Sequence, residues 1–224
     1  MDEQRPTGIE LPPVAPMLMQ SLRSVGYTTS AALADLVDNS IAADARNVSI
    51  RFATMQDPFV AIVDDGHGMA KADLVAAMRF GSRDPRDPRT GMDLGRFGLG
   101  LKTASLSQCR QLVVASLRDE QLSLASWDID ECERRCSWWL GQPDRSAIPE
   151  EILGVLTTQG KGTAVVWQHL DRLLATGGSD PRRAIETAIE DAADHLAMVF
   201  HRFLSGEIGP GLAHLIHRIY PTCV

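Results

Sequence analysis

The sequence has few cysteines, few aromatic residues and no long apolar run. Its 224 residues include 4 cysteines, and aromatic residues make up 5%. So few cysteines, at irregular spacing, exclude a disulfide scaffold and favour a reducing compartment. No window approaches the ~20 apolar residues of a membrane-spanning helix, and the N-terminus has no signal-peptide pattern. We therefore expect a cytoplasmic protein without membrane contact.

An excess of positive charge is also missing. Lys and Arg number 22 against 29 Asp and Glu, which gives a net charge of -7. A general attraction to nucleic acid is therefore not indicated. The chain does have 44% hydrophobic residues, enough for a substantial core at this length. We expect an irregular arm over residues 1–16, one α/β domain over 17–205 and a short tail over 206–224.

Periodicity and breakers place the secondary structure. Helices are expected over residues 17–25, 28–45, 71–78, 101–107 and 185–203. Strands are expected over residues 48–52, 59–63, 112–117, 122–127 and 163–167, with a weaker strand signal over 132–140. Residues 79–97 are rich in Gly, Pro and alternating charges, and we interpret them as a loop between two motifs.

The first motif is ALADLVDNSIAADA, residues 32–45. Asp35 and Asn39 are four residues apart, so both project from the polar side of an amphipathic helix. A carboxylate beside a carboxamide can orient a water molecule and hold hydrated magnesium, which prefers oxygen ligands. Taken alone, the pair is more typical of a solvated helix face.

The second motif is IVDDGHGM, residues 62–69. It places Asp64 at the end of a buried strand, followed by glycines that allow a ligand to approach the backbone. Asp64 is then positioned to accept a hydrogen bond from an exocyclic amine such as that of adenine. An ordinary Asp-Gly turn is the alternative.

The third motif is LGRFGLGLKTAS, residues 94–105. Leu101 separates the last glycine from Lys102, so the segment is not a Walker A loop, and Thr103 replaces the last glycine of a dinucleotide fingerprint. Its glycines still present free backbone N–H groups at a helix start, which favours an anion. A turn without a ligand is the alternative.

The fourth motif is GKGTAVVW, residues 160–167, in which Thr163 begins a strand. Thr163 can share a water molecule or the adenine edge with Asp64, although a β-turn needs no ligand. The sequence ECERRC, residues 131–136, has a cysteine spacing within zinc range. No matching Cys/His pair follows it, so we do not expect zinc.

In this order the four motifs resemble the GHKL superfamily of gyrase, heat-shock chaperone, histidine kinase and MutL. DLVDNS, FGSRD and DLGRFGLGLKTAS are most similar to MORC-like and related bacterial ATPases. The resemblance implies a Bergerat-type two-layer α/β sandwich, with a mixed sheet, helices on one face, and ATP held beneath a lid over residues 79–97. It also implies Mg²⁺ as cofactor.

The resemblance assigns roles residue by residue. Asp35 would be the general base, Asn39 would coordinate magnesium, and Asp64 would bind adenine. The remaining nucleotide-binding positions would be Gly66, Gly68, Met69, Gly95, Gly98, Leu99, Gly100, Lys102, Thr103 and Thr163. The family usually has Glu where this chain has Asp35, which is one methylene shorter, and an acidic residue where it has Ala42.

These motifs predict slow, Mg-dependent ATP hydrolysis that drives lid closure and a conformational or dimerisation switch. A nucleotide-binding module without turnover is the alternative, and a histidine-kinase catalytic domain is a weaker one because no phosphoacceptor helix precedes the motifs. Hydrolysing relatives carry a transducer domain for which residues 206–224 leave no room. We therefore expect weak turnover by this chain alone, and a homodimer or a further protein or domain as partner.

Overall fold

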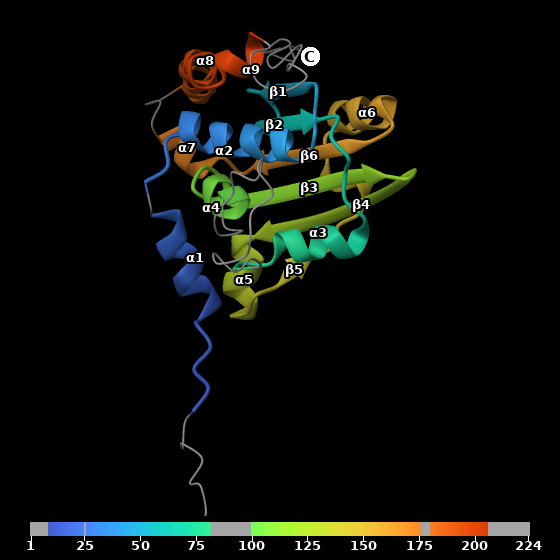
Figure 1. Cartoon of the computed structure of the whole chain (residues 1–224). Coiled ribbons are helices and arrows are strands. Elements are labelled where there is room, and N and C mark those ends of the chain that lie inside the picture. Colours follow the sequence, from blue (N-terminus) through green and yellow to red (C-terminus); the bar gives the residue numbers. More distant parts are fainter. Residues whose placement is uncertain (1–8, 25, 82–99, 176–179, 206–224) are drawn as a thin grey trace, which may run out of the picture.

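The computed structural model describes residues 9–24, 26–81, 100–175 and 180–205. Its centre is a six-stranded sheet with the strand order β1-β2-β6-β3-β4-β5 (Figure 1). The strands are β1 (Val48–Ala53), β2 (Phe59–Asp64), β3 (Gln111–Arg118), β4 (Gln121–Asp128), β5 (Leu140–Gly141) and β6 (Gly162–Gln168). The central strands are buried along both faces, which explains their nearly continuous apolar sequences.

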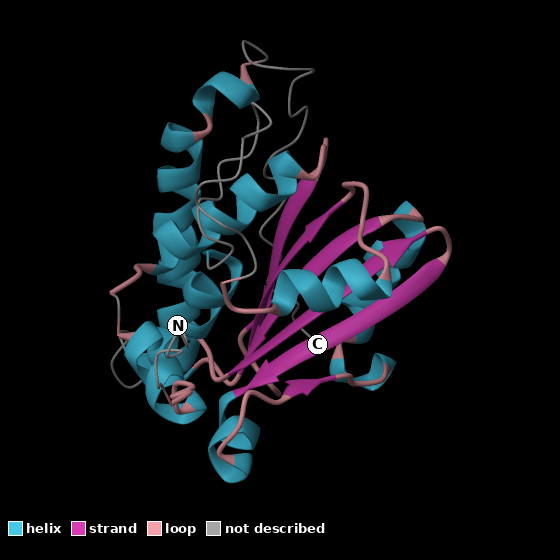
Figure 2. Ribbon diagram, turned by 60° about the horizontal axis from the view of Figure 1, so that its bottom comes forward, coloured by secondary structure: helices cyan, strands magenta, loops and turns pink. Residues whose placement is uncertain are grey.

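Most of the helices gather on one face of this sheet (Figure 2). The helices are α1 (Ala15–Arg23), α2 (Thr29–Ala42), α3 (Lys71–Met78), α4 (Gly100–Leu106), α5 (Ile129–Arg135), α6 (Glu150–Gln159), α7 (Asp171–Ala175), α8 (Pro181–Val199) and α9 (His201–Leu204), with one 3-10 turn at Arg145–Ala147. None of the helices within the described ranges is both long and apolar enough to cross a membrane.

Helix α2 carries the first motif and lies in contact with α4 and α8 (Figure 1). It begins where the Thr28 side chain accepts a hydrogen bond from the Ala31 N–H at 3.1 Å, as an N-cap does. Leu33, Leu36 and Val37 are fully buried and fix which side of the helix faces the sheet. Asp35, Asp38 and Asn39 are therefore turned away from the core, whereas Ser40 is buried.

The two-layer α/β class is confirmed, but two expected details are wrong. Every strand pair is antiparallel, so the sheet is not mixed. Helix α6 lies on the opposite face, where Ile152 and Leu156 pack among the buried side chains of β2, β3 and β6. The pattern of apolar residues predicts that a segment is a strand, but not whether it runs parallel or antiparallel to its neighbours, because that depends on how the connections cross the sheet.

Two local expectations are also corrected. Residues 129–135 form α5 because the Asp128 side chain caps it, accepting from the N–H groups of Asp130 and Glu131. Of the range with the weak strand signal, only Leu140 lies in a strand, β5. The long C-terminal helix is interrupted at Phe200, so α8 ends at Val199 and α9 follows.

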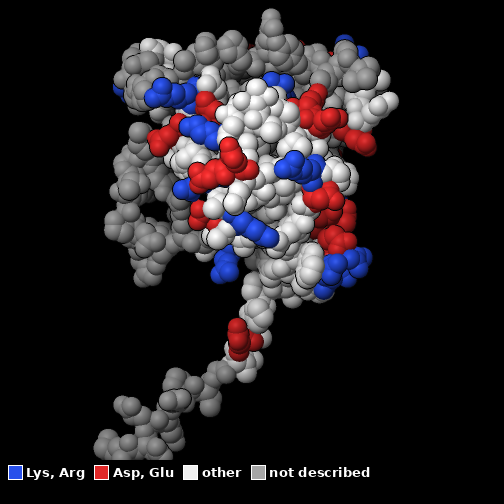
Figure 3. Space-filling view, turned by 90° about the vertical axis from the view of Figure 1, so that its right-hand side faces the viewer, with Lys and Arg blue, Asp and Glu red and all other residues white. Residues whose placement is uncertain are grey.

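The surface that carries α6 and the turn between β3 and β4 has mixed charge. Figure 3 shows Lys and Arg side chains interspersed with Asp and Glu on this face. Neighbouring charges of opposite sign reduce the field that either would exert on a distant ligand. This face therefore resembles an ordinary solvated surface.

Candidate functional site

Asp64 ends β2 and is buried, with 6% of its surface exposed. Its Oδ1 accepts hydrogen bonds from the backbone N–H groups of Gly66 at 2.9 Å and Thr163 at 3.2 Å, and its Oδ2 accepts from the Ser40 hydroxyl at 3.0 Å. Burial raises the pKa of Asp64 to about 6, although these three hydrogen bonds favour the charged form. The carboxylate is thus held in one orientation, with acceptor capacity remaining on Oδ2.

The loop after β2 is pressed against its neighbours through two glycines. Gly68 has a φ of +64°, and a Cβ there would lie 2.2 Å from the carbonyl oxygen of Leu117. A Cβ on Gly66 would lie 2.7 Å from the carbonyl oxygen of Ala43. Both positions therefore require glycine for packing within the chain, whatever the loop binds.

Thr163 lies beside Asp64 because the register of β2 and β6 pairs these two residues. Its hydroxyl shares a hydrogen bond of 2.9 Å with the Ser116 hydroxyl, which also accepts from the Met69 N–H at 2.8 Å. Ser116 thus connects the Asp-Gly loop to β6. Asp64 and Met69 of the second motif and Thr163 of the fourth therefore lie together at one corner of the sheet.

The polar side of α2 carries two neighbouring carboxylates. The Tyr27 hydroxyl donates to Asp35 Oδ2 at 2.9 Å. Burial, and then the negative charge of Asp35, raise the pKa of Asp38 to about 6. Asn39 is exposed one residue further on. Crowded carboxylates beside an exposed carboxamide form an electronegative, oxygen-rich surface.

Helix α4 begins against this surface. A Cβ on Gly100 would lie 3.6 Å from Asp35 Oδ2, so the first turn of α4 and the polar side of α2 are neighbours. Lys102 is buried, and its Nζ donates to the carbonyl of Ala77 in α3 at 2.6 Å. Thr103 is also buried. Gly95, Gly98 and Leu99 lie outside the described residues, as does most of the expected lid.

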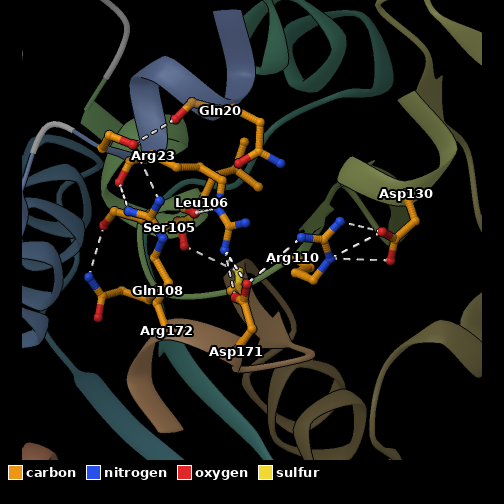
Figure 4. A network of polar contacts seen from close by, with 12 residues as sticks. Gln20, Arg23, Ser105, Leu106, Gln108, Arg110, Asp130, Asp171 and Arg172 are labelled. Atoms are coloured by element: carbon orange, nitrogen blue, oxygen red, sulfur yellow. Dashed lines mark hydrogen bonds and ion pairs between the residues drawn. The ribbon is translucent and has the colours of Figure 1, made fainter. Parts of the chain in front are cut away.

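A polar network fixes the far end of α4 (Figure 4). The buried Arg23 of α1 donates through Nε to the Leu106 carbonyl at 2.7 Å and through Nη2 to both oxygens of Asp171, at 2.6 and 2.8 Å. Arg110 bonds Asp130 and lies 3.8 Å from Asp171. The network connects α1, α4, α5 and α7.

Four polar residues of this region were not predicted as site residues: Tyr27, Asp38, Ser40 and Ser116. Ser40 and Ser116 had a usable signal, because each is a hydroxyl on an otherwise apolar face, where a buried polar group needs a partner. Tyr27 had no such signal, since its contact with Asp35 depends on how the chain turns before α2. In the described part of the chain, no three His, Cys, Asp or Glu side chains are grouped to hold a metal ion by themselves.

Comparison with known families agrees with this geometry. The family model described as "Histidine kinase-, DNA gyrase B-, and HSP90-like ATPase" matches residues 27–163, more than half of the chain. The chain belongs to this GHKL ATPase family. The GHKL match begins at Tyr27 and ends at Thr163, so it contains the first three motifs whole and the fourth motif as far as Thr163.

Individual GHKL relatives are similar over a shorter region. The chain is 35% identical over 89 residues to ATPase morc-1 of Caenorhabditis elegans, and 29% identical over 96 residues to ATPase MORC2 of Homo sapiens and ATPase MORC2A of Mus musculus. These regions cover 39% and 41% of this chain, but only 10% of the worm protein and 9% of each mammalian one. The chain thus matches about a tenth of the length of these relatives.

Proposed function

We propose that this chain binds Mg·ATP, with adenine at Asp64 and the phosphates between α2 and α4, and hydrolyses it slowly. The observation that carries the proposal is the environment of Asp64. A buried carboxylate fixed by Ser40, Gly66 and Thr163 retains an acceptor on Oδ2, which suits the exocyclic amine of adenine. Met69 and Thr163 would border the base.

The phosphate end of the proposed site is the polar side of α2 facing the start of α4. Asn39, with Asp35 and Asp38 close by, offers the oxygen atoms that magnesium prefers. Burial raises the pKa of Asp38 most, and the negative charge of Asp35 raises it further; a cation would relieve that second effect, so these residues fit the ion. When bound, magnesium would neutralise charge on the phosphate oxygens. The predicted phosphate contacts are Gly95, Gly98, Leu99, Gly100, Lys102 and Thr103.

Asp35 is the proposed general base. The carboxylate would accept a proton from the water that attacks the γ-phosphate. The closeness of Asp35 to Gly100, a predicted phosphate contact, supports this role. We further propose that nucleotide closes residues 79–97 over the site and promotes dimerisation. The alternative is nucleotide binding without turnover.

The test of the nucleotide site is Asp64→Asn. An amide is a weaker, neutral acceptor, so the affinity for ATP should fall by about tenfold or more. Isothermal titration with ATP and magnesium measures this directly, and the thermal stabilisation by ATP should shrink in parallel. Asp191→Asn, the same change at an exposed carboxylate on α8, is the matched control. Wild-type ATP affinity in Asp64→Asn would refute the assigned adenine site.

Phosphate release separates the two functions. We expect the wild-type chain to release phosphate at a measurable steady-state rate. A fall of this rate by ~10²-fold in Asp35→Asn, with unchanged ATP affinity, would support hydrolysis with Asp35 as general base. Asp35→Glu restores the longer carboxylate of the family and should change the rate if reach limits turnover. Tight ATP binding without measurable release would instead support the binding module.

A further inference from the structure

Asp35 has a partner from outside its own helix. The Tyr27 hydroxyl donates to Asp35 Oδ2 across the turn that precedes α2. The two residues are eight positions apart, so helical spacing alone does not bring them together. We propose that Tyr27 is a positioning residue for Asp35, which leaves Oδ1 as the oxygen that receives a proton from the attacking water.

The tyrosine is itself held firmly. Its ring is half-buried and packs against the core, while its carbonyl accepts a hydrogen bond from Gln108 Nε2 at 3.1 Å. Gln108 also accepts from the Thr29 hydroxyl through Oε1 at 2.8 Å. One side chain beyond the end of α4 therefore clamps both residues that flank Thr28, the cap of α2. The backbone from which the Tyr27 side chain reaches Asp35 is therefore held in place.

The hydroxyl acts as a donor throughout the neutral range. Burial, and then the hydrogen bond and charge of Asp35, raise the pKa of Tyr27 above its ordinary value, so the phenol stays protonated. An aspartate carboxylate rotates readily about its last torsion, because that torsion has no sharp minima. A fixed donor on Oδ2 restricts this rotation. Because Asp35 is shorter than the glutamate usual in the family, its reach depends more on this restriction, and a small misplacement of the carboxylate lowers the rate of hydrolysis.

The inference rests on the proposed function, because it assigns Tyr27 a role through Asp35. Tyr27→Phe removes the hydroxyl and keeps the ring. We expect kcat for ATP hydrolysis to fall about tenfold, while the ATP affinity stays within about twofold, because one hydrogen bond to a charged group is lost away from the nucleotide. Tyr220→Phe makes the same change at the only other tyrosine and should leave kcat unchanged.

A double-mutant cycle separates positioning from general structural damage. In the Asp35→Asn background, Tyr27→Phe should cause no further loss in single-turnover hydrolysis, because its effect passes through Asp35. A second tenfold loss there, or a weakened ATP affinity, would mean that Tyr27 acts structurally. If Tyr27→Phe keeps wild-type kcat while Asp35→Asn does not, the positioning role is wrong and the proposed function stands.

A spectroscopic measurement tests the contact itself. In the Tyr220→Phe chain, absorbance at 295 nm follows the ionisation of Tyr27 alone. Asp35→Asn removes the negative charge that disfavours the phenolate, so the titration midpoint should move to lower pH. An unmoved midpoint would overturn the contact. If Asp35→Asn hydrolyses ATP at the wild-type rate, the proposed general-base role of Asp35 fails and the role of Tyr27 fails with it, even where the midpoint moves.

Discussion

Asp38 is partly buried on α2, one turn from Asp35, and the cost of its negative charge should be visible in the stability of the protein. The folded chain raises the pKa of Asp38 to about 6, above the ordinary value of 3.8. Between these values the folded protein holds a proton that the unfolded chain releases. The contribution of Asp38 to stability is therefore greatest below about pH 4 and is lost as the pH rises through 6.

Asp38→Asn should consequently stabilise the protein at pH 8, where the carboxylate is charged, and should give no gain at pH 4, where it is protonated. Urea unfolding at the two pH values measures the difference in the free energy of unfolding. Asp191→Asn on exposed α8 serves as the control and should show no such pH dependence. An equal gain at both pH values would contradict the cost of the Asp38 charge as the cause.

At the scale of elements, α1 holds the end of α4 through one buried charge. Arg23 is 2% exposed and satisfies both the Leu106 carbonyl and Asp171. Arg23→Met keeps a long side chain but leaves both acceptors without this donor, so we expect a loss of about 3 kcal/mol in the free energy of unfolding. Chemical denaturation measures this loss.

The matched control for Arg23 is Arg134→Met. Arg134 pairs with Glu131 at an exposed position of α5, 62% exposed, where solvent screens the ion pair and its contribution to stability is small. A comparable loss in the two variants would show that Arg23 is not a structural link between α1 and α4. Asp171→Asn should lie between them, because the amide oxygen still accepts from Arg23.

Local patterning predicted most of these elements, and the reason is physical. Helix α2 and strands β1 to β4 and β6 each have a strong apolar pattern or a cap that their own residues supply. Helix α6 was not predicted, because its buried residues Ile152 and Leu156 pack against the second face of the sheet, a contact that the local sequence does not reveal. The break between α8 and α9 at Phe200 likewise has no local Pro or Gly signal.

For the whole molecule, the proposed switch predicts a response to nucleotide at residues 79–97. A non-hydrolysable ATP analogue should slow hydrogen exchange over this segment, because closing it over the phosphates would exclude water. Sedimentation velocity with the same analogue should show a dimer. Asp64→Asn should abolish both effects at matched analogue concentration. Exchange that is insensitive to the analogue in the wild-type chain would reject the closing segment.

The candidate site illustrates where sequence reasoning ends. The order of the motifs indicated the family. It also predicted that Asp64 and Thr163 act together, because each lies at the end of an expected strand, and the register of β2 and β6 does pair them. The contacts of Tyr27, Ser116 and Lys102 could not be foreseen, since each depends on which distant backbone lies opposite. Long-range packing, rather than local preference, selects those partners.

The end of α3 receives hydrogen bonds from two other elements: Lys102 of α4 bonds the Ala77 carbonyl, and the Trp127 indole of β4 bonds the Met78 carbonyl at 2.9 Å. Trp127 also lies 5.4 Å from the Phe80 ring, centroid to centroid. Replacing Trp138, Trp139 and Trp167 with phenylalanine would leave Trp127 as the sole indole fluorophore. Its emission would then report, in real time, whether Lys102 leaves α3 when nucleotide arrives.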